Sequence, residues 1–136
     1  MRKIKFRFWD KKRKIMHTAQ DKFGNYYINC HGDCFEEYGG CEHGGLLDYN
    51  EDMLALQFTG LYDTDGKEIY DGDIVEFIGH ARHWFNKFLV VKFNPHGGYY
   101  FSHEKERKSF SSNLAYKSEI KIVGNIYENS ELLEDK

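Results

Sequence analysis

The sequence predicts a mainly β protein with minor α content, built as an N-terminal β-hairpin subdomain followed by a small SH3-like β-barrel. Aromatic residues make up 17% of the 136 residues, and broad flat side chains pack well on a pleated surface. The chain also has 13 Gly and 1 Pro, a composition that suits many tight turns. Short strands joined by glycine turns are the pattern of a small barrel.

The N-terminal part begins with the clearest strand. Ile4, Phe6 and Phe8 alternate with charged neighbours, which predicts a strand with one buried and one solvated face. A polar turn follows and the chain returns, so we expect a hairpin. The strands expected in this part of the chain are 2–9, 14–17 and 22–29.

Residues 30–52 are the least regular part of the sequence. They hold all three Cys and five Gly, so we expect an exposed loop with a short helical turn at 33–38. The first expected segment is therefore 1–54, an N-terminal β subdomain with a Gly/Cys-rich loop.

The second segment, 55–128, is expected to form the barrel. Asp63-Thr64-Asp65-Gly66 is a hairpin turn with Gly where the backbone reaches positive φ, and the run FLVVKF is a buried strand. Helix is scarce, with candidates at 79–87 and 104–116. Residues 129–136 form an acidic tail. The strands expected from the end of the first segment onward are 53–58, 74–77, 88–93, 99–102 and 121–127.

Charge is spread unevenly along the chain, whose net charge is -3. Residues 1–16 carry eight Lys/Arg and one acid, whereas residues 17–76 carry two Lys/Arg and fourteen acids. Such a chain could pair head to tail with a copy of itself, so we expect a homo-oligomer. It lacks the uniformly basic field of a dedicated DNA-binding protein.

Apolar segments are short throughout the sequence. No run is long enough to cross a membrane, and the charged N-terminus has no signal-peptide core. We therefore expect a cytoplasmic protein without membrane contact. An odd number of cysteines, three, excludes a complete disulfide framework.

The Gly/Cys-rich loop offers one candidate metal site. Thiolate and imidazole are the ligands that zinc prefers, and the candidate ligands are Cys30, Cys34, Cys41 and His43, with His31 beside them. The spacing is C-x₃-C followed by C-x-H, which lacks the close cysteine pairs of a structural zinc site. An exposed loop with incidental cysteines is the more favoured interpretation, and we expect no cofactor.

The acids between Asp63 and Asp73 suggest calcium, but the loop glycine and the twelfth-position Glu of an EF-hand are out of place. Two adjacent β-turns fit better.

Cations interleaved with aromatic residues offer a candidate nucleic-acid surface, because aromatic rings stack on bases while cations hold phosphates. The candidate residues are Lys3, Lys5, Arg7, Arg82 and Trp84. The alternative is that Trp84 and its neighbours anchor a loop to the barrel.

Three blocks of sequence resemble the YopX family of phage and prophage proteins. They are Lys3–Asp10, Leu56–Val75 with its core LQFTGLYD, and Ile122–Glu128. The match spans most of the chain, and the chain could be the protein after which the family is named. The resemblance implies a small, intracellular, phage-associated protein, and it implies no activity and no catalytic residues.

No catalytic motif appears in the sequence: there is no G-x-S-x-G and no phosphate-binding loop. We therefore expect a non-enzymatic protein-interaction module whose partner is a host or phage protein. The alternative is a small β-barrel that binds nucleic acid.

Overall fold

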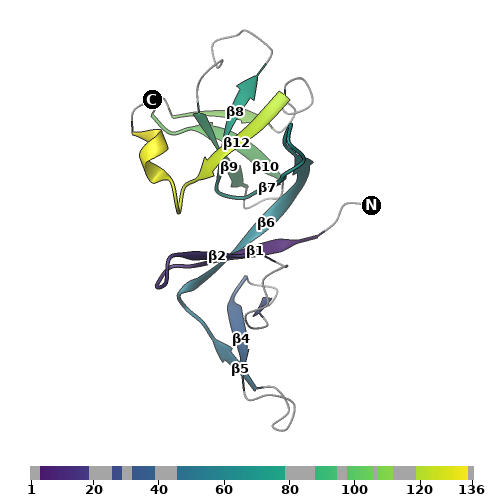
Figure 1. Ribbon diagram of the computed structural model, residues 1–136, viewed down its shortest axis with the longest axis vertical. Helices are drawn as coiled ribbons and strands as arrows, with labels where there is room; N and C mark the ends of the chain where they lie inside the picture. The colour runs from purple at the N-terminus through teal and green to yellow at the C-terminus, as the bar shows by residue number, and fades with distance from the viewer. Residues whose placement is uncertain are drawn as a thin grey trace. The chain divides into compact units, whose positions relative to one another are not determined.

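The computed structural model describes residues 4–18, 26–28, 32–38, 46–78, 88–94, 98–105, 107–111 and 119–134. It divides into two compact units, one formed by residues 5–57 and the other by residues 1–4 and 58–136. Strands dominate both units, and the regular helix of the described residues is one 3-10 turn, η3 (Ser130–Leu133). The predicted mainly β class is therefore confirmed (Figure 1).

The first unit contains the predicted N-terminal hairpin. β1 (Phe6–Asp10) pairs antiparallel with β2 (Ile15–His17). On its other side, β1 pairs with the first half of β6 (Met53–Tyr62), so that Phe6 faces Gln57 and Asp10 faces Met53. Trp9, Asp10 and Met53 are buried.

A second sheet of this unit corrects the expected loop at 30–52. β4 (Cys34–Tyr38) pairs antiparallel with β3 (Tyr26–Ile28) and with β5 (Leu46–Tyr49). Segment 33–38 was expected to form a helical turn, but most of it lies in β4, where both neighbours bond its backbone. Cross-strand hydrogen bonds outweigh the weak local preference of such a short segment.

The second unit is a curled antiparallel sheet that forms a half-barrel. The strand order is β11-β10-β9-β8-β12, and β7 pairs with the second half of β6. The strands are β7 (Glu68–Tyr70), β8 (Asp73–Ile78), β9 (Phe88–Phe93), β10 (Tyr99–His103), β11 (Lys108–Ser111) and β12 (Glu119–Asn125). The helix expected at 104–116 is wrong over 108–111, which is strand. Residues 112–116 of that candidate lie outside the described residues, as does the other helix candidate, 79–87.

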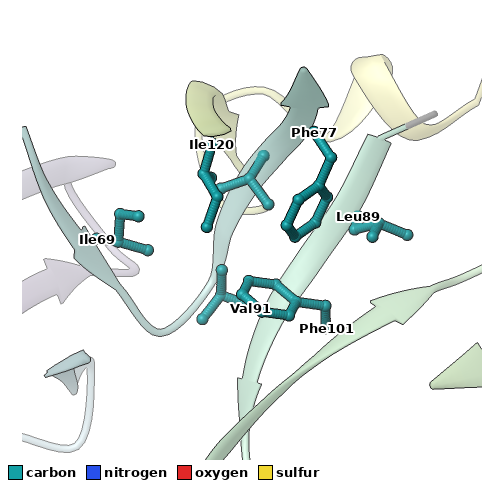
Figure 2. Close-up of a cluster of buried hydrophobic side chains, with 7 residues drawn as sticks. Ile69, Phe77, Leu89, Val91, Phe101 and Ile120 are labelled. Carbon is teal, nitrogen blue, oxygen red and sulfur yellow. The ribbon is translucent and has the colours of Figure 1, made fainter. Parts of the chain in front are cut away.

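A hydrophobic core is built from residues of this sheet and of β7. Figure 2 shows side chains from β7, β8, β9, β10 and β12 pointing toward one another. The rings of Phe77 and Phe101 meet edge to face, with centroids 5.0 Å apart, a favoured aromatic geometry. The buried members are Ile69, Val75, Phe77, Leu89, Val91, Phe101 and Ile120.

The hairpin from β6 to β7 contains a bulge. The pairing register shifts between Phe58 and Tyr62, and Gly60 has φ +90°. The buried Thr59 hydroxyl donates to the Ile69 carbonyl oxygen at 2.7 Å and accepts from the Leu61 N–H at 3.1 Å. The threonine side chain thus replaces backbone bonds that the bulge removes.

The described part of the chain contains no helix with the length and apolar character that a membrane crossing requires.

Candidate interaction surface

The turn between β1 and β2 presents four consecutive cations. Lys11, Lys12, Arg13 and Lys14 are all exposed, and we call them the basic turn. They separate Asp10 and Ile15, which are cross-strand partners in the β1–β2 ladder. The hairpin therefore concentrates its cations at one end.

Asp10 fixes the backbone of the basic turn. Its side chain is only 4% exposed, and its Oδ1 accepts hydrogen bonds from the N–H groups of Lys12 and Arg13, both at 3.0 Å. The Lys14 N–H donates to the Asp10 carbonyl oxygen at 2.8 Å. A short Asp side chain that bonds the backbone two and three residues onward is a common way to hold a turn.

Most of the positive charge in the basic turn is available to solvent. Arg13 Nη1 lies 3.7 Å from Asp10 Oδ2, whereas the ammonium groups of Lys11, Lys12 and Lys14 form no ion pair with the described residues. The backbone is ordered before binding and the long side chains remain exposed. Such an arrangement lowers the entropic cost of binding an anionic group.

Two acids limit the extent of this positive surface. The Lys11 N–H donates to the Asp52 carbonyl oxygen at 2.8 Å, which brings the turn before β6 beside the basic turn. Glu51 is exposed and Asp52 is half-buried. The cationic surface is therefore compact rather than a long track.

The predicted nucleic-acid residues are only partly described. Lys5 and Arg7 lie on or next to β1 and are half-buried, while Lys3, Arg82 and Trp84 lie outside the described residues. The structure does not test whether the five act together. Sequence reasoning left the basic turn out of this set, although four successive cations in a polar turn were visible.

The metal candidate Cys34 lies in β4 with 1% of its surface exposed. Its Sγ donates to the Gly32 carbonyl oxygen at 3.8 Å, and burial together with the Asp33 charge raises the pKa of the thiol. Cys30, His31, Cys41 and His43 lie outside the described residues. Within the described part, no three metal-binding side chains cluster, so the zinc site stays a prediction.

Two of the acids considered for calcium, Asp63 and Asp73, accept hydrogen bonds from the backbone. Asp63 is 7% exposed; its Oδ1 accepts from the N–H groups of Asp65 and Lys67 at 2.9 Å, and its Oδ2 accepts from Ile122 N–H at 3.2 Å. Burial alone would raise the pKa of this carboxyl, but the three hydrogen bonds and the Lys67 charge hold the pKa below its ordinary value. Asp73 Oδ2 likewise accepts from the Tyr70 N–H at 2.8 Å.

Comparisons with known proteins place these features in a family context. The model of the YopX family, described as YopX protein, matches residues 5–134. The yopX protein of Bacillus subtilis is 22% identical over 98% of this chain and 99% of that chain, with a TM-score of 0.64. Protein EF1440 of Enterococcus faecalis is 21% identical over 98% and 99% of the two chains, with a TM-score of 0.60. The comparison with curated proteins finds no match.

Proposed function

This chain belongs to the YopX family, and on that premise we propose that it is a non-enzymatic protein-interaction module that binds an acidic protein surface through the basic turn. At 22% identity it is a separate sequence from the Bacillus subtilis yopX protein. The resemblance to phage and prophage sequences supports a partner from the phage or its bacterial host, met in the cytoplasm.

The observation that carries the proposal is the basic turn itself. Four exposed cations stand on a backbone that the buried Asp10 carboxylate holds through two hydrogen bonds. Interfaces use such charged positions to steer association and to select partners of opposite charge.

The compactness of the surface favours a protein over a nucleic acid. A nucleic-acid backbone is bound along a track of several phosphates, and Glu51 and Asp52 interrupt the positive field beside Lys11. Among the described residues, the exposed aromatic side chains are Tyr49 and Tyr62, and neither belongs to the basic turn. Nucleic-acid binding through Lys5, Arg7 and the basic turn is the second candidate, because these cations share one hairpin.

The proposal is tested by affinity capture from a bacterial lysate, with and without nuclease. Lys12→Glu/Arg13→Glu reverses charge at the basic turn. The matched control, Lys67→Glu/Lys121→Glu, reverses two exposed lysines of the other unit. Circular dichroism checks that each variant folds.

The proposal is supported by a protein that is still captured after nuclease treatment, is captured by the control variant and is not captured by the basic-turn variant. The purified partner must then bind directly, and bind the native protein and the control but not the basic-turn variant. Capture that disappears with nuclease supports the second candidate. Equal capture by both variants contradicts a role for the basic turn.

A further inference from the structure

Two residues of the described chain adopt a left-handed backbone without being glycine. Seven described residues have clearly positive φ, and five of them are Gly. The other two are Lys14, with φ +59°, and Arg107, with φ +52°. Glycine is the residue expected there, because in other residues Cβ crowds the backbone in this conformation.

Lys14 and Arg107 occupy equivalent places in two hairpins. Lys14 directly precedes Ile15, which pairs with Asp10, and Arg107 directly precedes Lys108, which pairs with His103. Each is thus the last residue of a four-residue connection between antiparallel strands. The hairpin needs a residue in the left-handed conformation at this point, and in both hairpins that residue is a lysine or an arginine.

No side-chain contact with the described residues offsets the backbone strain at either position. Both residues are exposed, and neither the Lys14 ammonium nor the Arg107 guanidinium forms an ion pair or hydrogen bond with the described residues. Lys105, in the same turn as Arg107, differs, because its Nζ donates to the Glu134 carbonyl oxygen. Strain that no side-chain contact of the described residues offsets points to function.

We propose that Lys14 and Arg107 are binding residues, each kept at a left-handed position because its charge contacts an acidic protein surface. For Lys14 this inference rests on the proposed function: within the basic turn, Lys14 contributes to binding although its backbone conformation lowers the stability of the fold. For Arg107 it assigns a second contact point, on the β10–β11 turn of the other unit.

The test measures stability and binding on the same variants of the full chain. Lys14→Gly and Arg107→Gly relieve the strain and remove the charge, so the melting temperature should rise by about 3 °C. Binding of fluorescein-labelled poly-L-glutamate, followed by anisotropy at low salt, should weaken about two- to fivefold for each variant. Lys121→Ala is the control for loss of an exposed cation, and its affinity should stay unchanged.

Further variants separate the inference from the proposed function. If Lys12→Ala weakens binding and Lys14→Gly does not, the basic turn binds but the inference about Lys14 is wrong. If neither weakens binding, the proposed function falls as well. A lower melting temperature for both glycine variants would overturn the strain argument, and weakening seen only with a duplex DNA probe would overturn the choice of a protein partner.

Discussion

Replacing Asp63 by Asn should destabilise the half-barrel in a pH-dependent way. Asn keeps one carbonyl oxygen and puts an NH₂ group where Oδ2 now accepts from the Ile122 N–H at 3.2 Å. One donor then faces another in a site that is 7% exposed. Losing a hydrogen bond to a charged acceptor and leaving a buried N–H unpaired should cost about 2 kcal/mol at neutral pH.

The pH dependence follows from the pKa of Asp63, which folding lowers from its ordinary value of 3.8. A lowered folded-state pKa means that the carboxylate contributes its full stability above pH 3.8 and loses that contribution as the pH falls through the folded-state pKa. The difference between native protein and Asp63→Asn should therefore be largest near pH 7 and shrink in acid.

Urea unfolding of both proteins from pH 7 down to about pH 2 measures this difference directly. Asp65→Asn is the matched control, because Asp65 is exposed and lies in the same turn; it should change the free energy of unfolding by less than about 0.5 kcal/mol. A difference for Asp63→Asn that stays constant across the pH range would refute the reasoning, since the charge would then contribute nothing.

Three further predictions concern a glycine, a cysteine and the basic turn. Gly72→Ala should lower the free energy of unfolding in urea by more than Gly66→Ala does. Both glycines have positive φ, but an added Cβ at Gly72 would lie 2.7 Å from the Tyr127 ring, whereas nothing lies within 4 Å of an added Cβ at Gly66. Equal losses of stability would mean that the ring moves aside. The Cys34 thiol should react with a disulfide reagent only as fast as the protein opens, because it is buried and its pKa is raised. Rapid reaction of one thiol, lost in Cys34→Ser, would contradict this. If copies pair through the basic turn, sedimentation velocity should show larger species at low salt that Lys12→Glu/Arg13→Glu abolishes; a monomer at every concentration and salt would exclude the pairing.

Strong apolar patterns in the sequence predicted several strands of the half-barrel well. The run of β9 was predicted at its observed bounds of 88–93, because continuous apolar residues between polar turns have few other solutions. β12 was expected at 121–127 but ends at Asn125. The Asn125 side chain accepts from the N–H groups of Tyr127 and Glu128 and turns the chain, an effect of side-chain bonding that apolar patterning does not report.

Polar segments were predicted poorly for a physical reason. β11 has polar or charged residues at more than half of its positions, β4 contains two adjacent Glu residues, and β5 is a short segment in a glycine-rich stretch of sequence. Each is nevertheless bonded to a neighbouring strand. Their conformation depends on partners distant from the local pattern. The candidate site had the same difficulty: the cations of the basic turn are plain in the sequence, but only the structure shows that Asp10 orders their backbone and that Lys14 is left-handed.

The continuity of β6 has a consequence for how this fold can be taken apart. One strand, Met53–Tyr62, supplies a partner for β1 with its first half and a partner for β7 with its second half, so the boundary between the two units falls inside a strand (Figure 1). A gene fragment ending at residue 57, or beginning at residue 58, cuts the strand in two. Each unit expressed alone should therefore include the full length of β6, so that β1 or β7 keeps the whole of its partner strand.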